Sequence, residues 1–151
     1  HAEASMITRQ AKQIGLNKPF LSGDSVANPT FIELGGDSVE GHMFTDFFDH
    51  SAPPTSKSEE FIAAYEKKTG KRELNSFTAL GADAYNIMVD AMNRCANPED
   101  SVCVNGEIRK TSKFEGVSGF ISIDDKGNAT RSAVIKEIKD GKAVYKSTVN
   151  P

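Results

Sequence analysis

The sequence predicts an α/β fold whose C-terminal part is an antiparallel β-meander, and three observations support this prediction. Segments with the apolar spacing of helices alternate with short strand-like runs as far as Gly116. Beyond Gly116, apolar and polar residues alternate between hairpin turns, which is typical of paired antiparallel strands. The chain has 151 residues, of which 38% are hydrophobic and 26% charged, so its size and composition are those of an ordinary globular protein.

The first third of the chain is expected to alternate between helix and strand. The expected elements are a helix over 2–14, a short buried strand over 19–22, a helical turn over 28–34 and a strand over 43–48. In the first helix, Met6, Ile7, Ala11 and Ile14 recur at helical spacing and predict its buried face. The Pro53-Pro54 pair then predicts that regular secondary structure ends here, in a break or linker between two segments.

Two helices are expected after this break. The first covers 58–70 and is amphipathic, and the second covers 76–92 and is long and strongly apolar. Met88, Val89 and Met92 are predicted to face the core from the second helix. A weaker helix over 104–110 and strands over 120–123, 133–138 and 143–145 complete the chain.

The charge balance argues against nucleic acid or an anionic membrane as partner. There are 18 basic and 21 acidic side chains, so the net charge is −3, and the basic residues form no cluster. Trp is absent and 8% of the residues are aromatic, which leaves no stacking platform for single-stranded nucleic acid. The residues before Met6 contain no initiator Met and no signal peptide, so the chain is expected to be part of a longer protein.

The two cysteines are Cys95 and Cys103, and a turn containing Pro98 separates them. Their spacing fits no zinc or redox motif, whereas such a turn brings two α-carbons within reach of a disulfide. We expect a disulfide, which would place the protein in an oxidising compartment; two free thiols are the alternative. Neither a metal site nor a cofactor is predicted, since the acidic pairs follow no metal-ligand pattern.

One candidate motif surrounds Ser38. The run over 31–38, Phe-Ile-Glu-Leu-Gly-Gly-Asp-Ser, resembles the phosphopantetheine attachment motif of carrier proteins, in which the serine carries the prosthetic arm. In a carrier domain this serine opens a long apolar helix within a small helical bundle. Here Ser38 is followed by a strand-like run, and much of the chain has β character, so the carrier function is a less favoured alternative.

A second candidate motif is Gly23-Asp24-Ser25, which resembles the nucleophile block of GDS-type esterases, with Ser25 as the nucleophile. A serine nucleophile needs a histidine base that a carboxylate orients. The histidines are His1, His42 and His50, and none stands in the Asp-x-x-His arrangement that such enzymes carry near the C-terminus. The esterase function is therefore also a less favoured alternative, and we do not expect an enzyme.

A third signal extends along nearly the whole chain. Six blocks in this order resemble the type I periplasmic solute-binding proteins of ABC transporters, and most closely their Leu/Ile/Val-binding group: 9–24, 34–41, 64–71, 77–85, 113–119 and 120–128. Each block alone is a weak signal, but their order and spacing together are specific. The resemblance also accounts for the C-terminal meander and the pair of cysteines.

This resemblance implies part of a two-lobed, Venus-flytrap protein with three-layer αβα lobes, of which the chain would be the C-terminal portion. Residues 1–48 and 132–151 would belong to the C-terminal lobe and residues 52–130 to the N-terminal lobe, with hinge crossings near 49–54 and 130–132. Each lobe would then be incomplete. Exposed strand edges and uncovered apolar faces would favour swapping or self-association of the fragment.

The resemblance also implies ligand-binding residues. In the family, an acidic side chain of the C-terminal lobe binds the α-ammonium group of an amino acid, and Asp24 falls at that position. The alternative is that Asp24 only caps a turn or the following helix. Ser22 and Ser25 flank Asp24 and are secondary candidates. Phe77 falls where the family has an apolar wall near the ligand side chain, and a place in the core of its helix is the alternative.

The function implied is reversible binding of an amino acid, branched-chain or otherwise aliphatic, between two closing lobes. The partners implied are that amino acid and, through the parent protein, the membrane permease subunits of an ABC importer. The expected location is periplasmic, or extracellular with a lipid anchor in the parent protein. We expect weak or no binding by this chain alone, because it lacks the half that holds the ligand carboxylate.

Overall fold

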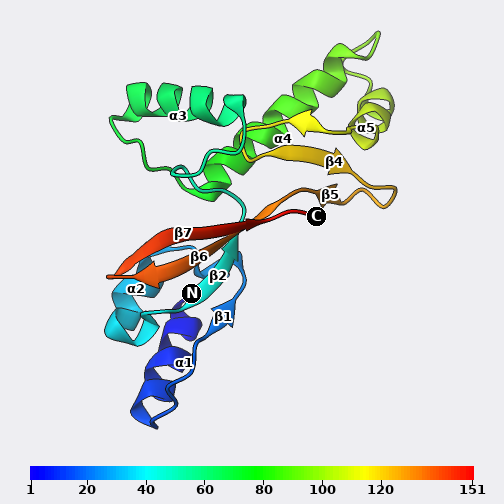
Figure 1. Cartoon of the computed structure of the whole chain (residues 1–151). Coiled ribbons are helices and arrows are strands. Elements are labelled where there is room, and N and C mark those ends of the chain that lie inside the picture. The colour runs from blue at the N-terminus through cyan, green and yellow to red at the C-terminus, as the bar shows by residue number, and fades with distance from the viewer. The chain divides into compact units, whose positions relative to one another are not determined.

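The computed structural model describes residues 1–151, and the chain divides into two compact units. Unit 1 comprises residues 1–46 and 133–149, and unit 2 comprises residues 47–132 and 150–151. The chain therefore passes between the units at 46/47, at 132/133 and at 149/150. Figure 1 labels the elements of both units. No helix in either unit combines the length and the apolar character that crossing a bilayer requires.

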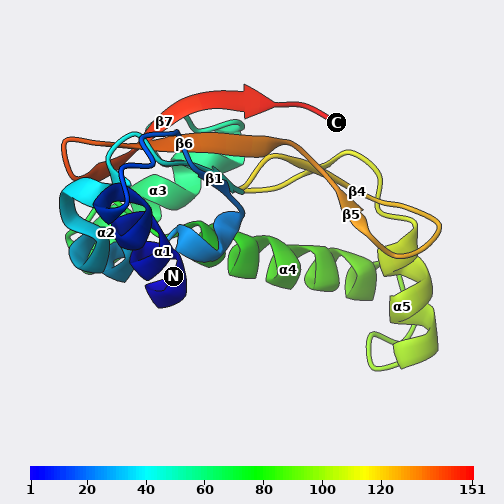
Figure 2. The ribbon, with the colours of Figure 1, turned by 90° about the horizontal axis from the view of Figure 1, so that it is seen from below.

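Unit 1 is built on a four-stranded sheet with the strand order β1-β2-β6-β7. Its strands are β1 (Leu21–Ser22), β2 (Met43–Asp46), β6 (Ala133–Lys139) and β7 (Lys142–Val149). β1 and β2 are parallel, and the other neighbouring pairs are antiparallel. The helices are α1 (Ala2–Gln13) and α2 (Pro29–Gly35), with 3-10 turns η1 (Asp24–Val26) and η2 (Gly36–Val39). Figure 2 shows α1 and α2 on the same side of the sheet.

The core of unit 1 lies between α2, the two 3-10 turns and the sheet. It consists of Val26, Phe31, Val39, Phe44 and Ile138, each at most 2% exposed. α2 begins where the sequence predicts a helical turn, because the Asn28 side chain accepts a hydrogen bond from the Thr30 backbone N–H at 2.9 Å. The core therefore joins residues that are more than 100 positions apart in the sequence.

The helix predicted over 2–14 is confirmed as α1, but its predicted buried face is right only at Ala11. Met6, Ile7 and Ile14 are 59%, 57% and 80% exposed. The buried residues of α1 are Ser5, Thr8 and Ala11. Both hydroxyls are satisfied inside the helix, since Ser5 donates to the Ala2 carbonyl at 2.7 Å and Thr8 to the Ser5 carbonyl at 2.9 Å. Small residues with satisfied hydroxyls can be buried at little cost, and they allow the helix to pack closely.

The two strands predicted in the first third of the chain are shorter than expected. β1 covers two residues, and Leu21 in it is 75% exposed, so the expectation of a buried strand is wrong there. β2 ends at Asp46 rather than at Phe48, because the chain enters unit 2 at Phe47. Phe48 is buried in the core of unit 2 instead.

Unit 2 consists of three helices and a small antiparallel sheet. The helices are α3 (Ser56–Thr69), α4 (Ser76–Asn93) and α5 (Ser101–Arg109), and the strands are β3 (Phe114–Glu115), β4 (Phe120–Ile123) and β5 (Ala129–Thr130). The strand order is β3-β4-β5. The core consists of Phe48, Ile62, Leu74, Ala79 and Val117.

α3 starts two residues before its predicted beginning. Its N-cap is Thr55, whose side chain accepts from the Ser58 backbone N–H, while the Ser58 hydroxyl accepts from the Thr55 backbone N–H, both at 3.1 Å. This reciprocal pair is a capping box. Gly70 ends the helix with a left-handed φ of 72°, which glycine adopts without strain.

The long helix predicted over 76–92 is confirmed as α4, but the predicted core-facing side is wrong. The buried residues are Ser76, Ala79, Asp83, Ile87 and Ala91. Met88 is 51% exposed, and both Val89 and Met92 are half-buried. The buried stripe contains a carboxylate, Asp83, so the apolar pattern alone does not reveal which side packs inward.

The strands after Gly116 are antiparallel, as the sequence predicts, but they are divided between the two sheets. β4 pairs with β3 and β5 in unit 2, and β6 pairs with β2 and β7 in unit 1. The change of sheet falls at the passage between the units at 132/133. This separation depends on long-range pairing, which the local alternation of residues does not encode.

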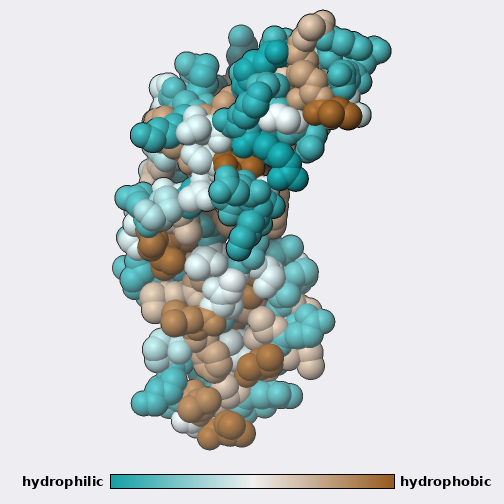
Figure 3. All heavy atoms as spheres, turned by 90° about the vertical axis from the view of Figure 1, so that its right-hand side faces the viewer, coloured by the Kyte–Doolittle hydropathy of each residue, from teal (hydrophilic) through white to brown (hydrophobic).

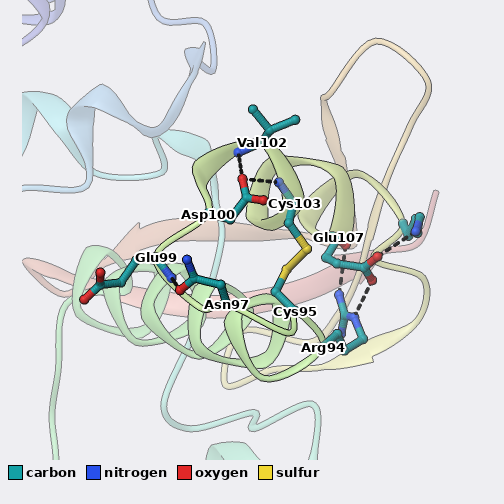
Figure 4. Close-up of a disulfide and its surroundings, with 9 residues drawn as sticks. Arg94, Cys95, Asn97, Glu99, Asp100, Val102, Cys103 and Glu107 are labelled. Atoms are coloured by element: carbon teal, nitrogen blue, oxygen red, sulfur yellow. Dashed lines mark hydrogen bonds and ion pairs between the residues drawn. A yellow bond between two sulfur atoms is a disulfide. The ribbon is translucent and has the colours of Figure 1, made fainter.

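The predicted disulfide is present between Cys95 and Cys103, with α-carbons 6.1 Å apart (Figure 4). It joins the end of α4 to α5, which begins at Ser101 rather than at Val104 because Asp100 caps it through the Val102 and Cys103 N–H groups. None of the residues of α5 is buried. The disulfide therefore supplies part of the attachment that burial does not.

Polar contacts reinforce this attachment. Arg94 at the end of α4 donates to the Glu107 carboxylate at 2.9 Å and to the Glu107 carbonyl at 2.8 Å (Figure 4). It also forms an ion pair with Asp90. Hydrogen bonds from Lys110 and from Arg94 hold the pKa of the Glu107 carboxyl below its ordinary value. α5 is thus held by one covalent bond and a small ion-pair network.

Candidate functional site

The predicted ligand-binding residues of unit 1 lie at the carboxyl end of β1. Ser22 is the last residue of the strand, and Asp24 is the first residue of η1, with Ser25 directly after it. Ser22 and Asp24 are half-buried, and Ser25 is exposed. β1 lies parallel to β2, and the carboxyl ends of parallel strands are the edge at which α/β proteins bind ligands.

The Asp24 carboxylate takes no part in the local structure. The N-cap of η1 is Gly23, without a side-chain hydrogen bond, and the Asp24 contact in the turn is its backbone carbonyl, which accepts from the Ala27 N–H at 2.9 Å. No hydrogen bond or ion pair within the chain reaches the Asp24 side chain. The geometry therefore gives no support to a capping role and leaves both carboxylate oxygens able to accept from a ligand.

Ser22 forms a hydrogen bond with a histidine that none of the sequence motifs indicates. The Ser22 Oγ and the His42 Nε2 are 2.8 Å apart, and His42 is 4% exposed. The imidazole stacks on Phe20 at 6.1 Å between ring centroids and meets the edge of Phe31 at 4.9 Å. Burial lowers the pKa of His42 below the ordinary value for histidine, so the ring is neutral at pH 7.

The pair formed by Ser22 and His42 lacks the third member of a catalytic triad. The His42 Nδ1 is buried and has no hydrogen-bond partner, so no carboxylate orients the ring. The hydroxyl that His42 contacts is that of Ser22 and not that of Ser25, the nucleophile of the esterase alternative. One pattern could have indicated the burial of His42: it stands two residues before the buried Phe44 and so lies on the same side of the extended chain.

Phe77, the fourth predicted ligand contact, belongs to unit 2. It is the second residue of α4, and its backbone N–H donates to the side chain of the N-cap Asn75 at 2.8 Å. Its side chain is 55% exposed, so it is not part of the core of unit 2. Ser22, Asp24 and Ser25 are thus brought together by one continuous segment, and Phe77 is presented at the start of a helix in the other unit.

Unit 1 also has a hollow of about 390 Å³ beside the end of α1. Lys12, Lys18, Asp37 and His42 are among the residues that line it, and none of Ser22, Asp24 and Ser25 does. No group of three or more His, Cys, Asp or Glu side chains in the chain is arranged to hold a metal ion. The carboxylate of Asp24, half-buried and without a partner, is therefore the strongest binding group at the strand end.

Comparison with known proteins gives a match over almost the whole chain. The family described as "Periplasmic binding protein" matches residues 2–143. The Leu/Ile/Val-binding protein homolog 3 of Brucella melitensis is 26% identical over 145 residues, which are 95% of this chain and 38% of that protein. The homolog 2 of Brucella abortus is 28% identical over 149 residues, 96% of this chain and 39% of that protein.

Solved structures of two further proteins are similar. The crystal structure of a leucine binding protein, LivK, from Thermotoga maritima superposes with a TM-score of 0.90 and 38% identity. The branched-chain amino acid transporter substrate binding protein LivJ of Streptococcus pneumoniae, solved in complex with isoleucine, superposes with a TM-score of 0.81 and 26% identity. Each match covers 99% of this chain and 42% of the other protein. The chain thus spans about two fifths of the length of these relatives.

Proposed function

The chain belongs to the periplasmic binding protein family, of type I, and on this basis we propose that it forms part of the solute-binding component of an ABC importer. The solute we propose is an amino acid with an aliphatic, branched side chain, bound reversibly between two closing lobes. The similar proteins support this class of solute, since they are two Leu/Ile/Val-binding protein homologs, a leucine binding protein and a branched-chain amino acid binding protein solved with isoleucine. The family binds solutes and carries out no chemical step.

The observation that carries the proposal is the Asp24 carboxylate at the end of β1. It is half-buried and has no partner within the chain, so an ammonium group of a ligand could bind it without displacing a structural contact. A carboxylate paired with a primary ammonium in a site that excludes water forms a strong, charge-assisted hydrogen bond. We propose this role for Asp24 toward the α-ammonium group of the amino acid.

We propose lesser roles for three other side chains. The Ser25 hydroxyl is exposed next to Asp24 and is available to donate or accept. The Ser22 hydroxyl is hydrogen-bonded to His42, so we propose that it both holds the end of β1 in place and contacts the ligand. Phe77, exposed at the start of α4, is proposed as an apolar wall for the ligand side chain.

We further propose that unit 1 is part of the C-terminal lobe and unit 2 part of the N-terminal lobe. The limits of the two units, at 46/47 and 132/133, support a division of this kind. The proposed partners are the permease subunits, which would contact the parent protein, and the proposed location is periplasmic or extracellular. The disulfide between Cys95 and Cys103 supports an oxidising compartment.

The carrier and esterase alternatives receive no support. Ser38 lies in the 3-10 turn η2 and is followed by β2, whereas a carrier serine opens a helix. Ser25 has no imidazole as a partner, because His42 contacts Ser22. Membership in a family of solute binders also argues against a hydrolytic reaction.

A chimera tests the role of Asp24. This chain would replace the matching part of the Thermotoga maritima leucine binding protein, to which it is 38% identical, and leucine binding would be measured by isothermal titration. We expect the Asp24→Asn chimera to bind leucine about tenfold more weakly or worse, since it leaves the ammonium group without its charged partner. The Asp125→Asn chimera is the control, because Asp125 is exposed at the turn after β4. Equal affinity of the Asp24→Asn and unmodified chimeras would contradict the proposed role.

The isolated chain provides a second test. Because it spans about two fifths of its relatives, we expect titration of this chain with leucine to give weak or no heat of binding. Micromolar affinity would show that the groups needed for binding are all within these 151 residues. That result would overturn the proposal that the ligand is shared with a part of the protein outside this chain.

A further inference from the structure

A buried carboxylate in α4 binds a loop far away in the sequence. Asp83 is 2% exposed and accepts hydrogen bonds from the Val117 N–H at 2.5 Å, from the Ser118 N–H at 2.8 Å and from the Ser118 hydroxyl at 2.6 Å. A buried carboxylate is costly unless such donors satisfy it. The three donors therefore fix the loop 116–118 against α4.

The loop approaches α4 so closely that only glycine fits at its first position. A Cβ on Gly116 would lie 2.5 Å from the Asp83 Oδ1. The start of α3 holds the same loop from another side, because Thr55 donates to the Gly116 carbonyl at 2.7 Å and Ser58 to the Val117 carbonyl at 2.6 Å. The loop is thus bound by two helices and is a rigid part of unit 2.

From this rigid loop, contacts reach two of the three chain segments that lead out of unit 2, those at 46/47 and 132/133. The Ser118 hydroxyl donates to Asp83 and accepts from the Arg131 Nη1 at 2.9 Å. The Arg131 guanidinium in turn lies 4.4 Å from the centroid of the Phe47 ring. Phe47 is the first residue after the passage at 46/47, and Arg131 stands two residues before Ala133, where the chain returns to unit 1.

We propose that Asp83, Ser118 and Arg131 form a hinge anchor, which holds the crossing segments at 46/47 and 132/133 against the rigid part of unit 2 and so limits the motion of one unit relative to the other. A crossing segment that is held to within a residue or two of the passage has few free backbone torsions left for hinge motion. Arg131 suits this role because its planar guanidinium stays charged and can contact a hydroxyl and an aromatic ring at once. The anchor involves no solute, so it stands or falls independently of the proposed binding function.

The test measures the freedom of one unit relative to the other in the full chain. Spin labels are attached to cysteines introduced at Gln10 in α1 and Lys68 in α3, both exposed. The two native cysteines are joined in the disulfide, so they leave no free thiol to label. Double electron–electron resonance then gives the distribution of the label-to-label distance at low protein concentration. We expect Ser118→Ala and Arg131→Gln each to widen this distribution about twofold.

Hydrogen exchange gives an independent readout of the loop. In Ser118→Ala the backbone amide of residue 118 should exchange about tenfold faster, because the Asp83 carboxylate then accepts from two donors of the loop instead of three. The matched controls are Ser56→Ala, which removes a 2.7 Å hydrogen bond to Glu115, and Arg72→Gln, which removes ion pairs with Glu59 and Glu66. Both controls lie in unit 2, and both should leave the distance distribution unchanged.

Unchanged distributions in Ser118→Ala and Arg131→Gln would overturn the proposal, as would equal widening in the two controls. If Ser118→Ala loses its helical circular-dichroism signal, it no longer folds and cannot test the hinge anchor. Arg131→Lys then serves as the test. This variant keeps the positive charge but loses the planar guanidinium. A distribution as narrow as that of the parent would then show that the crossing segments do not depend on this contact.

Discussion

Two glycines of unit 2 show how differently single positions respond to the same substitution. Gly81 lies within α4, and a Cβ built on it meets no atom within 4 Å. Gly116 faces Asp83, whose carboxylate would lie 2.5–3.0 Å from the new Cβ. The one position has room for a methyl group, and the other is filled by a buried charge.

We predict opposite effects of alanine at these two positions. Gly81→Ala should stabilise the protein by about 0.5–1 kcal/mol, because alanine loses less backbone entropy in a helix. Gly116→Ala should destabilise it by about 1–3 kcal/mol, because the loop or the carboxylate must move. Urea denaturation of both variants and of the parent measures these changes in the free energy of unfolding. Equal stability of Gly116→Ala and the parent would show that the close approach to Asp83 has no energetic consequence.

His42 predicts a dependence of stability on pH. Burial lowers its pKa in the folded state. As the pH falls through about 6.5, the ordinary pKa of histidine, the imidazole of the unfolded chain therefore binds a proton while that of the folded chain stays neutral. The unfolded state therefore binds more protons as the pH falls, and the free energy of unfolding should decrease below about pH 6.5. This decrease in the free energy of unfolding at low pH should be present in the parent and smaller in His42→Asn.

Urea midpoints at about pH 8 and about pH 5 measure this difference, since most carboxylates stay ionised over this range. His50→Asn is the matched control, because it also removes one imidazole from the chain. The control should keep the pH dependence of the parent. If His42→Asn and His50→Asn lose it equally, the burial of His42 is not its source.

At the scale of elements, α5 is unusual because it has no fully buried residue and is joined to α4 by a disulfide and ion pairs. None of its residues is buried, and Val102 is 81% exposed. The disulfide to Cys95 and the contacts of Arg94 with Glu107 join it to α4 (Figure 4). A helix of nine residues without a buried face has little stability of its own.

We predict that removing the disulfide releases α5. The variant with both Cys95→Ser and Cys103→Ser should lose about 2–3 kcal/mol of stability, since the closed loop is short. Hydrogen exchange should show lost protection in 101–109 and unchanged protection in α3. The parent should lose the same stability when a reductant is added, whereas the double variant should not respond to it. Retained protection of 101–109 in the double variant would contradict this prediction.

At the scale of the whole molecule, unit 1 leaves several large apolar side chains exposed to solvent instead of burying them in its core. Met6, Ile7, Ile14, Leu16, Leu21 and Leu34 are each at least 45% exposed. Figure 3 shows hydrophobic groups among polar ones on one face of the surface. β1 is also an end strand of its sheet, so its outer edge is unpaired. Apolar surface and a free strand edge together favour association.

We therefore predict that the chain associates with itself as its concentration rises. Size exclusion with light scattering should give a mass above the 16.3 kDa of one chain, both with and without reductant. Ile7→Lys combined with Ile14→Lys should shift the mass toward that of the monomer. Val102→Lys is the control, since Val102 is equally exposed but stands alone on α5. A monomer at all concentrations would contradict the prediction.

How far the sequence predicts this structure depends on the range of the interactions involved. The helix limits at Asn28, Asn75 and Gly70 follow from side chains and backbone a few positions apart, so they were predictable to within a few residues. The disulfide was predictable for the same reason, because its cysteines are eight positions apart. The family resemblance also rests on local blocks of sequence.

The predictions that fail most clearly concern which faces of the elements are buried. The apolar spacing in α1 indicates Met6 and Ile7 as its buried side, but the core receives Ser5 and Thr8, whose hydroxyls bind their own helix. In the candidate site, Asp24 was predictable from the resemblance. For His42 the sequence offers only its place two residues before Phe44, because its burial depends on Phe20 and Phe31 packing around it. Packing of this kind is a property of several segments together.

The sequence by itself determined the α/β class, most of the helices, the disulfide and the family to which the chain belongs. Only the tertiary structure decided which helix faces are buried, how the C-terminal strands divide between two sheets, and that Asp83 binds a loop 34 and 35 positions away. The physical reason is that local interactions set where an element begins and ends. Burial and buried hydrogen bonds depend on partners that the chain brings together only when it folds.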